Sequence, residues 1–239
     1  MALQPWRKGI ITRMEIEAYN TKRFWIQVPE LEAFDFKPGQ FVTLDLPIHE
    51  KPNKRVRSYS IASWPDGSNT FELVIVLMEG GLGTSHIFNE WKENTEITFR
   101  GAQGVFVLPE TLDKDLFLIC TGTGIAPFRS MLHYINIHNV PHKNIYLIFG
   151  TRTKANLLYY NELRDLTEQI PTLHYMPTLS REEWEGKKGY VHQIYQELIK
   201  DKQPAIFMLC GWKNMIDEAK QNLLAMGYDK KAIHLELYG

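Results

Sequence analysis

The stretch from Leu116 to Pro127, LFLICTGTGIAP, decides how the second half of the chain folds. Its first five residues form a short apolar run, which is typical of a buried strand in a parallel sheet. Glycines in the following turn let backbone N–H groups approach a phosphate, and Pro127 suits the first turn of a helix with a partly positive N-terminus. The stretch therefore predicts a strand, a helix and, between them, an anion-binding turn, although such a glycine turn can also serve packing alone. The turn consists of Thr121, Gly122, Thr123 and Gly124.

The chain after Pro109 repeats this alternation of strand and helix. Four apolar runs are expected to be parallel strands, namely Leu116–Cys120, Ile145–Phe149, Thr172–Met176 and Ile206–Leu209. The amphipathic segments between and after them are expected to be helices, near Ala126–Ile137, Tyr160–Gln169, Val191–Lys200 and Asn214–Met226. This order predicts a doubly wound α/β parallel sheet, and such sheets bind ligands at the carboxyl ends of their strands.

Before about Gly101 the pattern changes to short extended runs separated by turn residues. The runs are Gly9–Ile16, Arg23–Val28, Gln40–Leu46, Arg57–Ala62, Thr70–Leu77 and Thr95–Phe99. One helix interrupts them, from Thr84 or Ser85 to about Trp91, with Ser85 as the expected N-cap. We therefore expect an antiparallel barrel or sandwich over residues 1–108 and an α/β domain over residues 109–239.

Composition and charge exclude several functions. The net charge of -1 provides no surface for a polyanion, so nucleic acid is not an expected partner. There is no run of about eighteen apolar residues and no apolar signal core near Met1, so we expect a cytoplasmic protein without a membrane segment. Two cysteines are too few for an iron–sulfur cluster, which needs about four thiolates, and Cys120 is expected to be a buried core thiol. Because Pro141 separates His138 from His142, no metal site is expected.

Residues Arg57 to Ser60, RSYS, end one of the extended runs and combine groups that suit a flavin. An arginine can bind a pyrophosphate, the tyrosine ring can cover a flat ring, and a serine hydroxyl can reach the atom that accepts a hydride. The same alternation also fits an ordinary half-buried strand, so these residues alone leave both readings open.

Residues at the ends of the second and third parallel strands favour NADPH over NADH. A site for NAD usually has an acidic side chain here for the ribose hydroxyls, whereas Arg152 would attract a 2′-phosphate. Ser180 and Arg181 together can bind a phosphate through a hydroxyl and a planar guanidinium. The alternative is that Arg181 pairs with Glu182 or Glu185 on the surface.

The fourth strand and the end of the chain supply the last candidates. Cys210 at the strand tip would face the same crevice, and Gly211 permits the close approach of a ring. The apolar residues Ile233, Leu235 and Leu237 predict a final strand that fixes Tyr238.

In this order the motifs resemble the ferredoxin-NADP reductase family of flavoproteins. They are R-x-Y-S, GGLGTS, TGTGIAP, SRE, C-G-x-x-x-M and E-x-Y, and they span nearly the whole chain. The resemblance implies an N-terminal antiparallel β-barrel that binds FAD and a C-terminal α/β domain that binds NADP(H). It also implies hydride transfer between nicotinamide C4 and flavin N5, with ferredoxin or flavodoxin as the one-electron partner. A reductase component of an oxygenase system would carry the same sites, so sequence does not separate these two functions. A non-turnover electron-transfer subunit would carry a cysteine cluster that this chain lacks.

The resemblance assigns roles to single residues as well. For FAD it implies pyrophosphate contacts from Arg57, Gly83, Thr84 and Ser85, stacking by Tyr59, a hydrogen bond from Ser60 to N5, and a place for Ser58 within the same motif. For the nicotinamide nucleotide it implies Thr121, Gly122, Thr123 and Gly124 at the pyrophosphate and Ser180 with Arg181 at the 2′-phosphate. The predicted catalytic residues are Ser60, Cys210 beside nicotinamide C4, Glu236 in a proton path and Tyr238 over the second flavin face. Gly239 follows this tyrosine, whereas plant-type members end on the aromatic residue.

Overall fold

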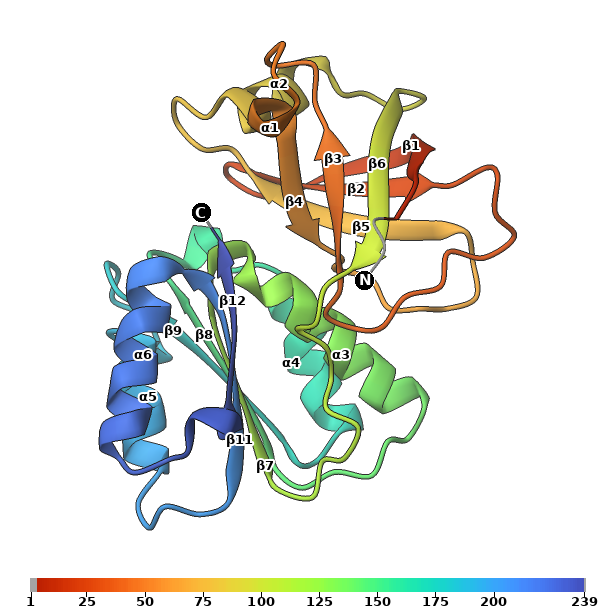
Figure 1. Ribbon diagram of the computed structural model, residues 1–239. Helices are drawn as coiled ribbons and strands as arrows, with labels where there is room; N and C mark the ends of the chain where they lie inside the picture. The colour runs from red at the N-terminus through yellow and green to blue at the C-terminus, as the bar shows by residue number, and fades with distance from the viewer. Residues whose placement is uncertain (1–3, 239) are drawn as a thin grey trace. The chain divides into compact units, whose positions relative to one another are not determined.

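The computed structural model describes residues 4–238, so the expectation about Gly239 lies outside the described residues. The chain divides into two compact units, each with its own sheet (Figure 1). The first unit comprises Met1–Leu108 and Ala126–Tyr134, and the second comprises Pro109–Ile125 and Ile135–Gly239. Between residues 4 and 238 no helix is both long and apolar enough to cross a bilayer.

The first unit contains a six-stranded antiparallel sheet in the order β4-β3-β6-β1-β2-β5. Its strands are β1 (Trp6–Ala18), β2 (Thr21–Gln27), β3 (Phe41–Asp45), β4 (Val56–Ser60), β5 (Thr70–Val76) and β6 (Glu96–Gln103). Directly after β4, Ile61 forms a bridge with Leu73 of β5, so the two edges of the sheet meet. The sheet therefore closes into a barrel, and the predicted antiparallel β-barrel is confirmed.

Alternate side chains of the strands fill this barrel, as the period of two predicts. Phe24 of β2 and Leu44 of β3 have no exposed surface. Helix α2 (Leu82–Glu90) adds the buried Ile87, and the Trp91 ring that follows meets the Phe24 ring edge-on at 5.4 Å. The barrel core is therefore continuous with the inner face of α2.

Two features of this unit differ from expectation. Helix α2 begins at Leu82 with Gly81 as its N-cap, so the prediction of Ser85 as the N-cap is wrong. The physical reason is that the chain already turns at Gly80, which has a positive φ of 71°, two residues before the helix. The short helix α1 (Pro52–Arg55) carries no apolar periodicity and was not expected.

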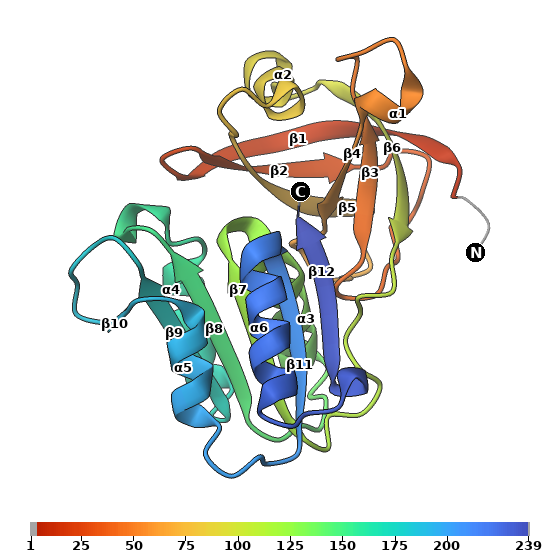
Figure 2. The ribbon, with the colours of Figure 1, turned by 60° about the vertical axis from the view of Figure 1, so that its left-hand side comes forward.

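The second unit contains a six-stranded parallel sheet in the order β10-β9-β8-β7-β11-β12 (Figure 2). Its strands are β7 (Asp115–Thr121), β8 (Ile145–Thr151), β9 (Leu173–Leu179), β10 (Lys187–Lys188), β11 (Ala205–Trp212) and β12 (Ile233–Tyr238). The helices are α3 (Ile125–Ile137, shared with the first unit), α4 (Tyr160–Gln169), α5 (Val191–Leu198) and α6 (Lys213–Ala225), and three 3-10 turns are η1 (Gly122–Gly124), η2 (Lys154–Asn156) and η3 (Lys230–Ala232).

Helices cover both faces of this sheet. Helices α5 and α6 pack on one face, where Phe117 and Ile119 of β7 join Ile194 and Ile216 in one core, and α4 lies on the other face (Figures 1 and 2). The predicted doubly wound α/β parallel sheet is confirmed. From β7 the chain moves outward to β8 and β9 and then returns to β11 on the other side. The crevice between β7 and β11 is therefore the topological switch point, where open α/β sheets bind their ligands.

The middle of helix α3 is part of the first unit. Arg129 on this helix is 4% exposed and donates hydrogen bonds to the Ala62 carbonyl at 2.8 Å and to Glu72 Oε2 at 3.0 Å. Its guanidinium also lies 5.3 Å from the centre of the Trp64 ring, whose other partner is the stacked His133 ring. The first unit therefore contains a buried charge network that the sequence patterns did not predict.

Candidate functional sites

The first candidate site is formed by strand β4 and the first turn of α2. Arg57 and Tyr59 lie on one face of β4, because side chains alternate along a strand. A Cβ atom on Gly83 would lie 3.2 Å from Arg57 Cγ, so the helix start and the arginine are in direct contact. The structure therefore brings together Arg57 and Gly83, two residues predicted to bind one pyrophosphate.

This site has the donors that a diphosphate needs. The first N–H groups of a helix have no partner within the helix and carry partial positive charge. In α2 the Ser85 N–H donates to the Gly81 carbonyl, so the N–H groups that precede it in the helix are the ones that can face a ligand. Arg57 Nη1 is held by the carbonyls of Lys54 and Val56 at 3.0 and 2.7 Å. A glycine at position 83 leaves the space that any larger residue would fill. The residues present therefore fit a diphosphate group such as that of FAD.

Thr84 and Ser58 have other local partners. The Thr84 hydroxyl accepts a hydrogen bond from the Met78 N–H at 3.1 Å and so holds the loop before α2. The Ser58 hydroxyl lies 3.1 Å from Thr43 Oγ1, on the face of β4 opposite Arg57. The geometry thus does not bring the Ser58 side chain together with Arg57 and Tyr59.

Tyr59 and Ser60 lie at the end of β4, beside the barrel core. Burial raises the pKa of Tyr59 to about 12, and the nearby charge of Arg57 opposes this shift. The Tyr59 phenol is therefore neutral at physiological pH, which suits a ring that would pack against a flat ligand. Ser60 is 4% exposed. Both residues remain candidates for contact with a flavin.

The second candidate site lies at the switch point between β7 and β11, in the second unit. A Cβ atom on Gly124 would lie only 2.5 Å from the Cys210 carbonyl oxygen, so Gly124 is required for packing. Gly122 is different, because its φ is +55° and a Cβ atom there would meet nothing within 4 Å. The two predicted roles of the glycine turn, packing and ligand binding, thus fall to different residues. Gly124 serves packing, and Gly122 with its neighbours Thr121 and Thr123 leaves backbone open to a ligand.

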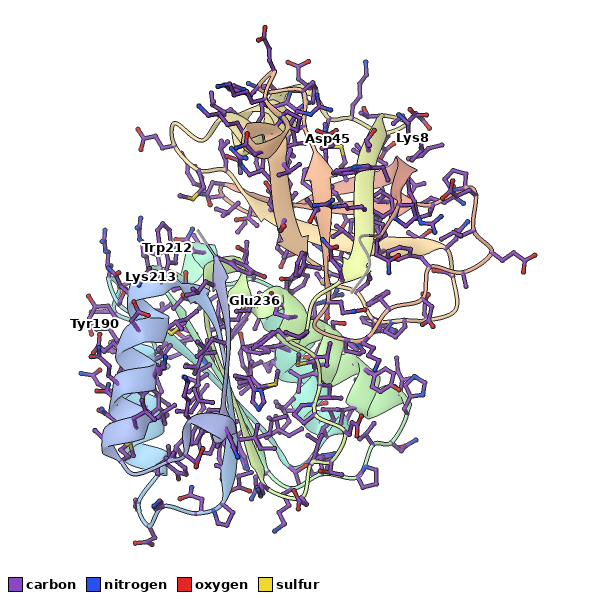
Figure 3. All side chains as sticks on the ribbon, viewed as in Figure 1. Lys8, Asp45, Tyr190, Trp212, Lys213 and Glu236 are labelled. Carbon is purple, nitrogen blue, oxygen red and sulfur yellow. The ribbon has the colours of Figure 1, made fainter. Side chains whose placement is uncertain are left out.

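Three titratable side chains lie in one row across neighbouring strands of this sheet. Cys120 of β7 is in register with Cys210 of β11, and Cys210 is in register with Glu236 of β12. Glu236 is labelled in Figure 3. Burial raises the pKa values of both thiols well above the usual range, and the Glu236 carboxylate raises that of Cys210 further. Both cysteines are therefore neutral thiols at physiological pH, and the prediction of a buried Cys120 is confirmed. Two residues further along these strands, Tyr238 is in register with Trp212.

The predicted phosphate-binding residues lie together at the ends of β8 and β9. The Ser180 N–H donates to the Thr151 carbonyl at 3.0 Å, and the Arg181 N–H donates to the Arg152 carbonyl at 2.9 Å. This pairing places the two arginines side by side at the carboxyl edge of the sheet. Within residues 4–238 neither guanidinium forms an ion pair.

The carboxylates expected as alternative partners of Arg181 bind Lys154 instead. Glu182 Oε2 accepts the backbone N–H of Lys154 at 2.7 Å, and Glu185 Oε1 pairs with Lys154 Nζ at 2.8 Å. The hydrogen bond to Glu185 raises the pKa of Lys154, and the same bond lowers the pKa of Glu185. The surface ion pair considered for Arg181 is therefore wrong, and its charge is available for a ligand.

Sequence patterns missed two aspects of this edge. Lys187 and Lys188 form the short strand β10 and pair with Glu197 and Glu183, so their charges are already used. Tyr190, the N-cap of α5, is 67% exposed although it is a large aromatic residue. A tyrosine two residues after a short edge strand gives no periodic signal, so its exposure could not be predicted from the sequence.

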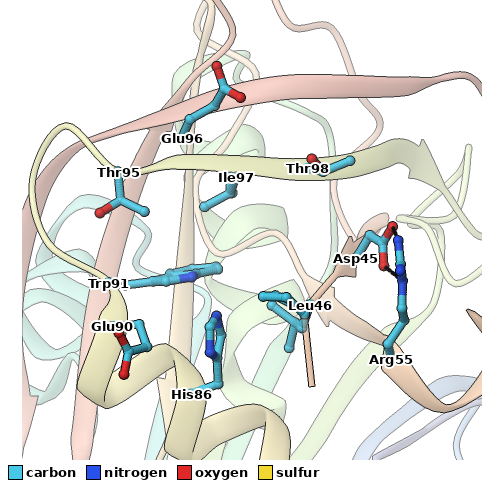
Figure 4. A pocket seen from close by; sticks show the side chains of 11 residues that line it. Asp45, Leu46, Arg55, His86, Glu90, Trp91, Thr95, Glu96, Ile97 and Thr98 are labelled. Carbon is cyan, nitrogen blue, oxygen red and sulfur yellow. Dashed lines mark hydrogen bonds and ion pairs between the residues drawn. The ribbon is translucent and has the colours of Figure 1, made fainter. Parts of the chain in front are cut away.

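The first unit also contains a cavity of about 370 Å³ between the end of α2 and strands β3 and β6 (Figure 4). None of the predicted flavin-binding residues lines it. Its charged groups are largely satisfied, because Arg55 pairs with Asp45 and Lys8 Nζ lies 2.9 Å from Glu96. The cavity therefore offers little unpaired charge for a ligand.

Comparison with known proteins agrees with this division. Residues 8–108 match the oxidoreductase FAD-binding domain family, and residues 118–221 match the oxidoreductase NAD-binding domain family. Over 218 residues the chain is 32% identical to ferredoxin--NADP reductase B of Sorangium cellulosum, and the match covers 87% of each chain.

Two further proteins extend this comparison. The glycine betaine monooxygenase reductase subunit of Pseudomonas aeruginosa is 30% identical over 248 residues, covering 99% of this chain and 66% of the relative. A crystal structure of a ferredoxin NADP+ reductase from Neisseria gonorrhoeae with bound FAD and NADP superposes with a TM-score of 0.82 at 27% identity, covering 97% of this chain and 98% of that one.

Proposed function

Because the chain belongs to the ferredoxin-NADP reductase family of FAD- and NAD(P)-binding oxidoreductases, we propose that it transfers electrons between NADPH and a one-electron protein carrier, ferredoxin or flavodoxin. The observation that supports the choice of NADPH is that Arg152 and Arg181 are backbone neighbours at the carboxyl edge of the sheet, and that neither guanidinium has an ion pair within residues 4–238. Arginine binds phosphate through a planar set of donors, and a 2′-phosphate distinguishes NADPH from NADH. Ser180 would add its hydroxyl to the same phosphate.

FAD belongs to the first domain, over residues 1–108. When bound, it supplies the chemistry that side chains lack, because it accepts a hydride from nicotinamide at N5 and releases electrons singly. Arg57 and the first turn of α2 would hold its diphosphate, through the N–H groups of Gly83 and Thr84 and the hydroxyl of Ser85. Tyr59 would cover one face of its ring, and Ser60 would donate a hydrogen bond at N5.

The NADP domain, over residues 109–239, would orient the nicotinamide. The backbone at Thr121, Gly122, Thr123 and Gly124 would bind the diphosphate of the nucleotide. Cys210 has no exposed surface, so it would touch the nicotinamide ring only once a neighbouring side chain moves, and it would do so as a neutral thiol because burial raises its pKa. Glu236, the neighbour of Cys210 in register, would hold the proton that the reaction moves, and Tyr238 would cover the second flavin face.

A second function is favoured by one comparison. The reductase subunit of a monooxygenase matches 99% of this chain at 30% identity, so the electron acceptor could be an oxygenase component. The two functions share every site described above and differ only in acceptor. The two buried free cysteines suit a reducing compartment, so we propose that either function takes place in the cytoplasm.

Rapid mixing of the FAD-loaded protein with NADPH and with NADH tests the proposed function. NADPH is expected to bleach the flavin absorbance at a much lower concentration than NADH. Adding ferredoxin, flavodoxin or an oxygenase component to the reduced protein then identifies the acceptor by the rate of its reduction. A protein whose flavin is not reduced by either nucleotide would contradict the proposal.

The first prediction concerns FAD. The purified protein is expected to carry a flavin spectrum, and Arg57→Ala is expected to weaken FAD binding by roughly 10- to 100-fold, because a charge-assisted hydrogen bond contributes about 1.5 to 3 kcal/mol. Equilibrium dialysis against FAD measures this. Arg55→Ala is the matched control, since Arg55 pairs with Asp45. Equal losses in the two variants would show that Arg57 acts only through the fold.

The second prediction concerns Tyr238. If its ring must leave the flavin before nicotinamide binds, Tyr238→Ser is expected to tighten NADP+ binding by up to about tenfold, since an aromatic stack contributes about 0.5 to 1.5 kcal/mol. The ratio of the affinities for NADPH and NADH should stay unchanged, because added nicotinamide stacking helps both nucleotides equally. Calorimetric titration with NADP+ checks this, and an unchanged dissociation constant would mean that Tyr238 does not guard the ring.

A further inference from the structure

Strand β12 forms one edge of the parallel sheet (Figures 1 and 2). It pairs with β11 on one side, and within residues 4–238 no strand pairs with its other side. The edge of a sheet presents a row of backbone N–H and C=O groups that can pair with another chain, so proteins usually protect edges with short strands, lysines or prolines. The length and sequence of β12 therefore decide whether this edge is protected.

The other sheet edges of this protein follow the rule. At the opposite edge of the same sheet, β10 consists only of Lys187 and Lys188, and both lysines pair with carboxylates. In the first unit the two edges meet at the bridge from Ile61 to Leu73. Strand β12 is six residues long and contains neither lysine nor proline. Among the strands of residues 4–238 it is thus a long edge without protection.

Apolar side chains are exposed along this edge. Leu235 is 40% exposed and Leu237 is 53% exposed. Leu235 is in register with Leu209 of β11, which belongs to the core under α5 and α6, so Leu235 lies on the same face of the sheet. Leu237 and Ile233 share this face, because side chains alternate along a strand. A second strand beside β12 would remove the two exposed leucines from water, which is favourable.

The sequence of β12 is complementary to itself. When two copies of the strand run antiparallel with Leu235 at the centre, Leu235 faces Leu235 of the second copy. His234 then faces Glu236, and Ile233 faces Leu237, once in each direction. An imidazole N–H can donate to a carboxylate, and apolar pairs of this kind are the unit that stabilises a sheet.

Neighbouring registers lose this match. With Glu236 at the centre, two carboxylates would face each other, and like charges directly opposite destabilise a sheet. With His234 at the centre, two imidazoles would face each other, and Glu236 would face Ala232, which precedes the strand. The residues of β12 therefore favour one register over the next on either side.

We infer that two copies of this chain pair through β12 as an antiparallel, two-fold symmetric dimer centred on Leu235. A two-fold contact uses the same patch on both copies, so the dimer closes and the edge is no longer open. The contact is one strand wide, and small interfaces of this kind are weak, so the dimer is reversible. The inference does not rest on the proposed function, because it uses only the edge of the sheet and no nucleotide.

Sedimentation velocity of the FAD-loaded protein over about 1 to 300 μM measures the association. The average mass is expected to rise toward that of a dimer as the concentration rises. Leu235→Lys is expected to weaken association by more than about tenfold, because it removes the central apolar pair and places two like charges opposite each other. Ile16→Lys is the matched control, since Ile16 is an exposed aliphatic residue of β1, which has a strand on each side. This variant should associate as the wild type does.

Disulfide cross-linking tests the register. Residue 235 faces itself in the proposed dimer, so Leu235→Cys is expected to give a covalent dimer on a non-reducing gel after mild oxidation with diamide. Leu237→Cys is the matched control, because the two copies of residue 237 would lie about 13 Å apart along the strands, beyond the reach of a disulfide. The natural Cys120 and Cys210 have no exposed surface, so the wild type should not cross-link.

The cysteine variants keep the inference testable if Leu235→Lys does not fold. A wild-type protein that stays monomeric at every concentration would overturn the inference and leave the edge of β12 to a strand of another protein. Equal cross-linking at positions 235 and 237 would overturn it too, as would a Leu235→Lys variant that associates normally or an Ile16→Lys variant that dissociates to the same extent. None of these results concerns flavin reduction, so the proposed function would stand.

Discussion

Replacing Glu72 by glutamine is expected to lower the free energy of unfolding by about 3 to 5 kcal/mol, the usual cost of removing one partner from a buried ion pair. Glu72 is 2% exposed and binds two guanidinium groups at once. Arg23 donates to it at 2.6 and 3.0 Å, and Arg129 donates to Oε2 at 3.0 Å. Glutamine keeps the shape of the side chain but removes its negative charge. Its amide N–H groups would also face the N–H donors of Arg23 and Arg129. Arg129, 4% exposed, would then lose the negative charge of Glu72 beside its buried guanidinium.

Thermal unfolding of the FAD-loaded protein measures this effect. The midpoint should fall by roughly 6 to 20 °C, because about 1 kcal/mol corresponds to 2 to 4 °C in a chain of this size. Glu96→Gln is the matched control, since its pair with Lys8 is exposed and such pairs contribute at most about 1 kcal/mol. Similar shifts in both variants would show that the buried network does not stabilise the barrel.

Regular elements could be predicted from the sequence because local patterns determine them. The segment Tyr160–Gln169 matches α4 at both ends, since Leu163 and Leu166 define one apolar face of an otherwise polar helix. The run from Leu116 to Cys120 lies inside β7, because its apolar side chains are buried on both faces of the sheet. The short elements α1 and β10 have too few residues to show a period, and they were missed.

The Glu72 network was missed for a different physical reason. Arg23 and Arg129 are 49 and 57 residues from Glu72 along the chain, and each looks like an ordinary surface charge in its own segment. Only the closed barrel and the packing of α3 bring them together. Patterns with a short period report which residues share a face, but they carry no information about such distant pairs.

The candidate sites show the same division. Motif order placed Arg57 and Gly83 in one site, and the structure brings them into contact. Whether Arg181 was free or paired could not be decided from the sequence, because Glu182 and Glu185 follow it closely and could either pair with it or bind another group. The decision depends on Lys154, about a strand and a helix away, which binds both Glu182 and Glu185.

Because Arg181 forms no ion pair within residues 4–238, its replacement should change the preference between NADPH and NADH. Arg181→Ala is expected to raise the Michaelis constant for NADPH by roughly tenfold or more and to leave that for NADH nearly unchanged. The reason is that a charge-assisted hydrogen bond to phosphate contributes about 1.5 to 3 kcal/mol, and NADH has no 2′-phosphate to receive it. Reduction of the bound flavin by each nucleotide, followed by its absorbance in rapid-mixing experiments, measures the change.

Two further variants define what the result means. Arg164→Ala is the matched control, because Arg164 is an exposed arginine of α4 that pairs with its neighbour Asp165, and it should alter neither nucleotide. Arg152→Ala should repeat the selective loss if both guanidinium groups bind one phosphate. An equal loss for NADPH and NADH in Arg181→Ala would instead mean that this arginine supports the turn after β9. The NADPH preference would then have to arise from Arg152 and Ser180, which the backbone pairing of β8 with β9 places at the same edge.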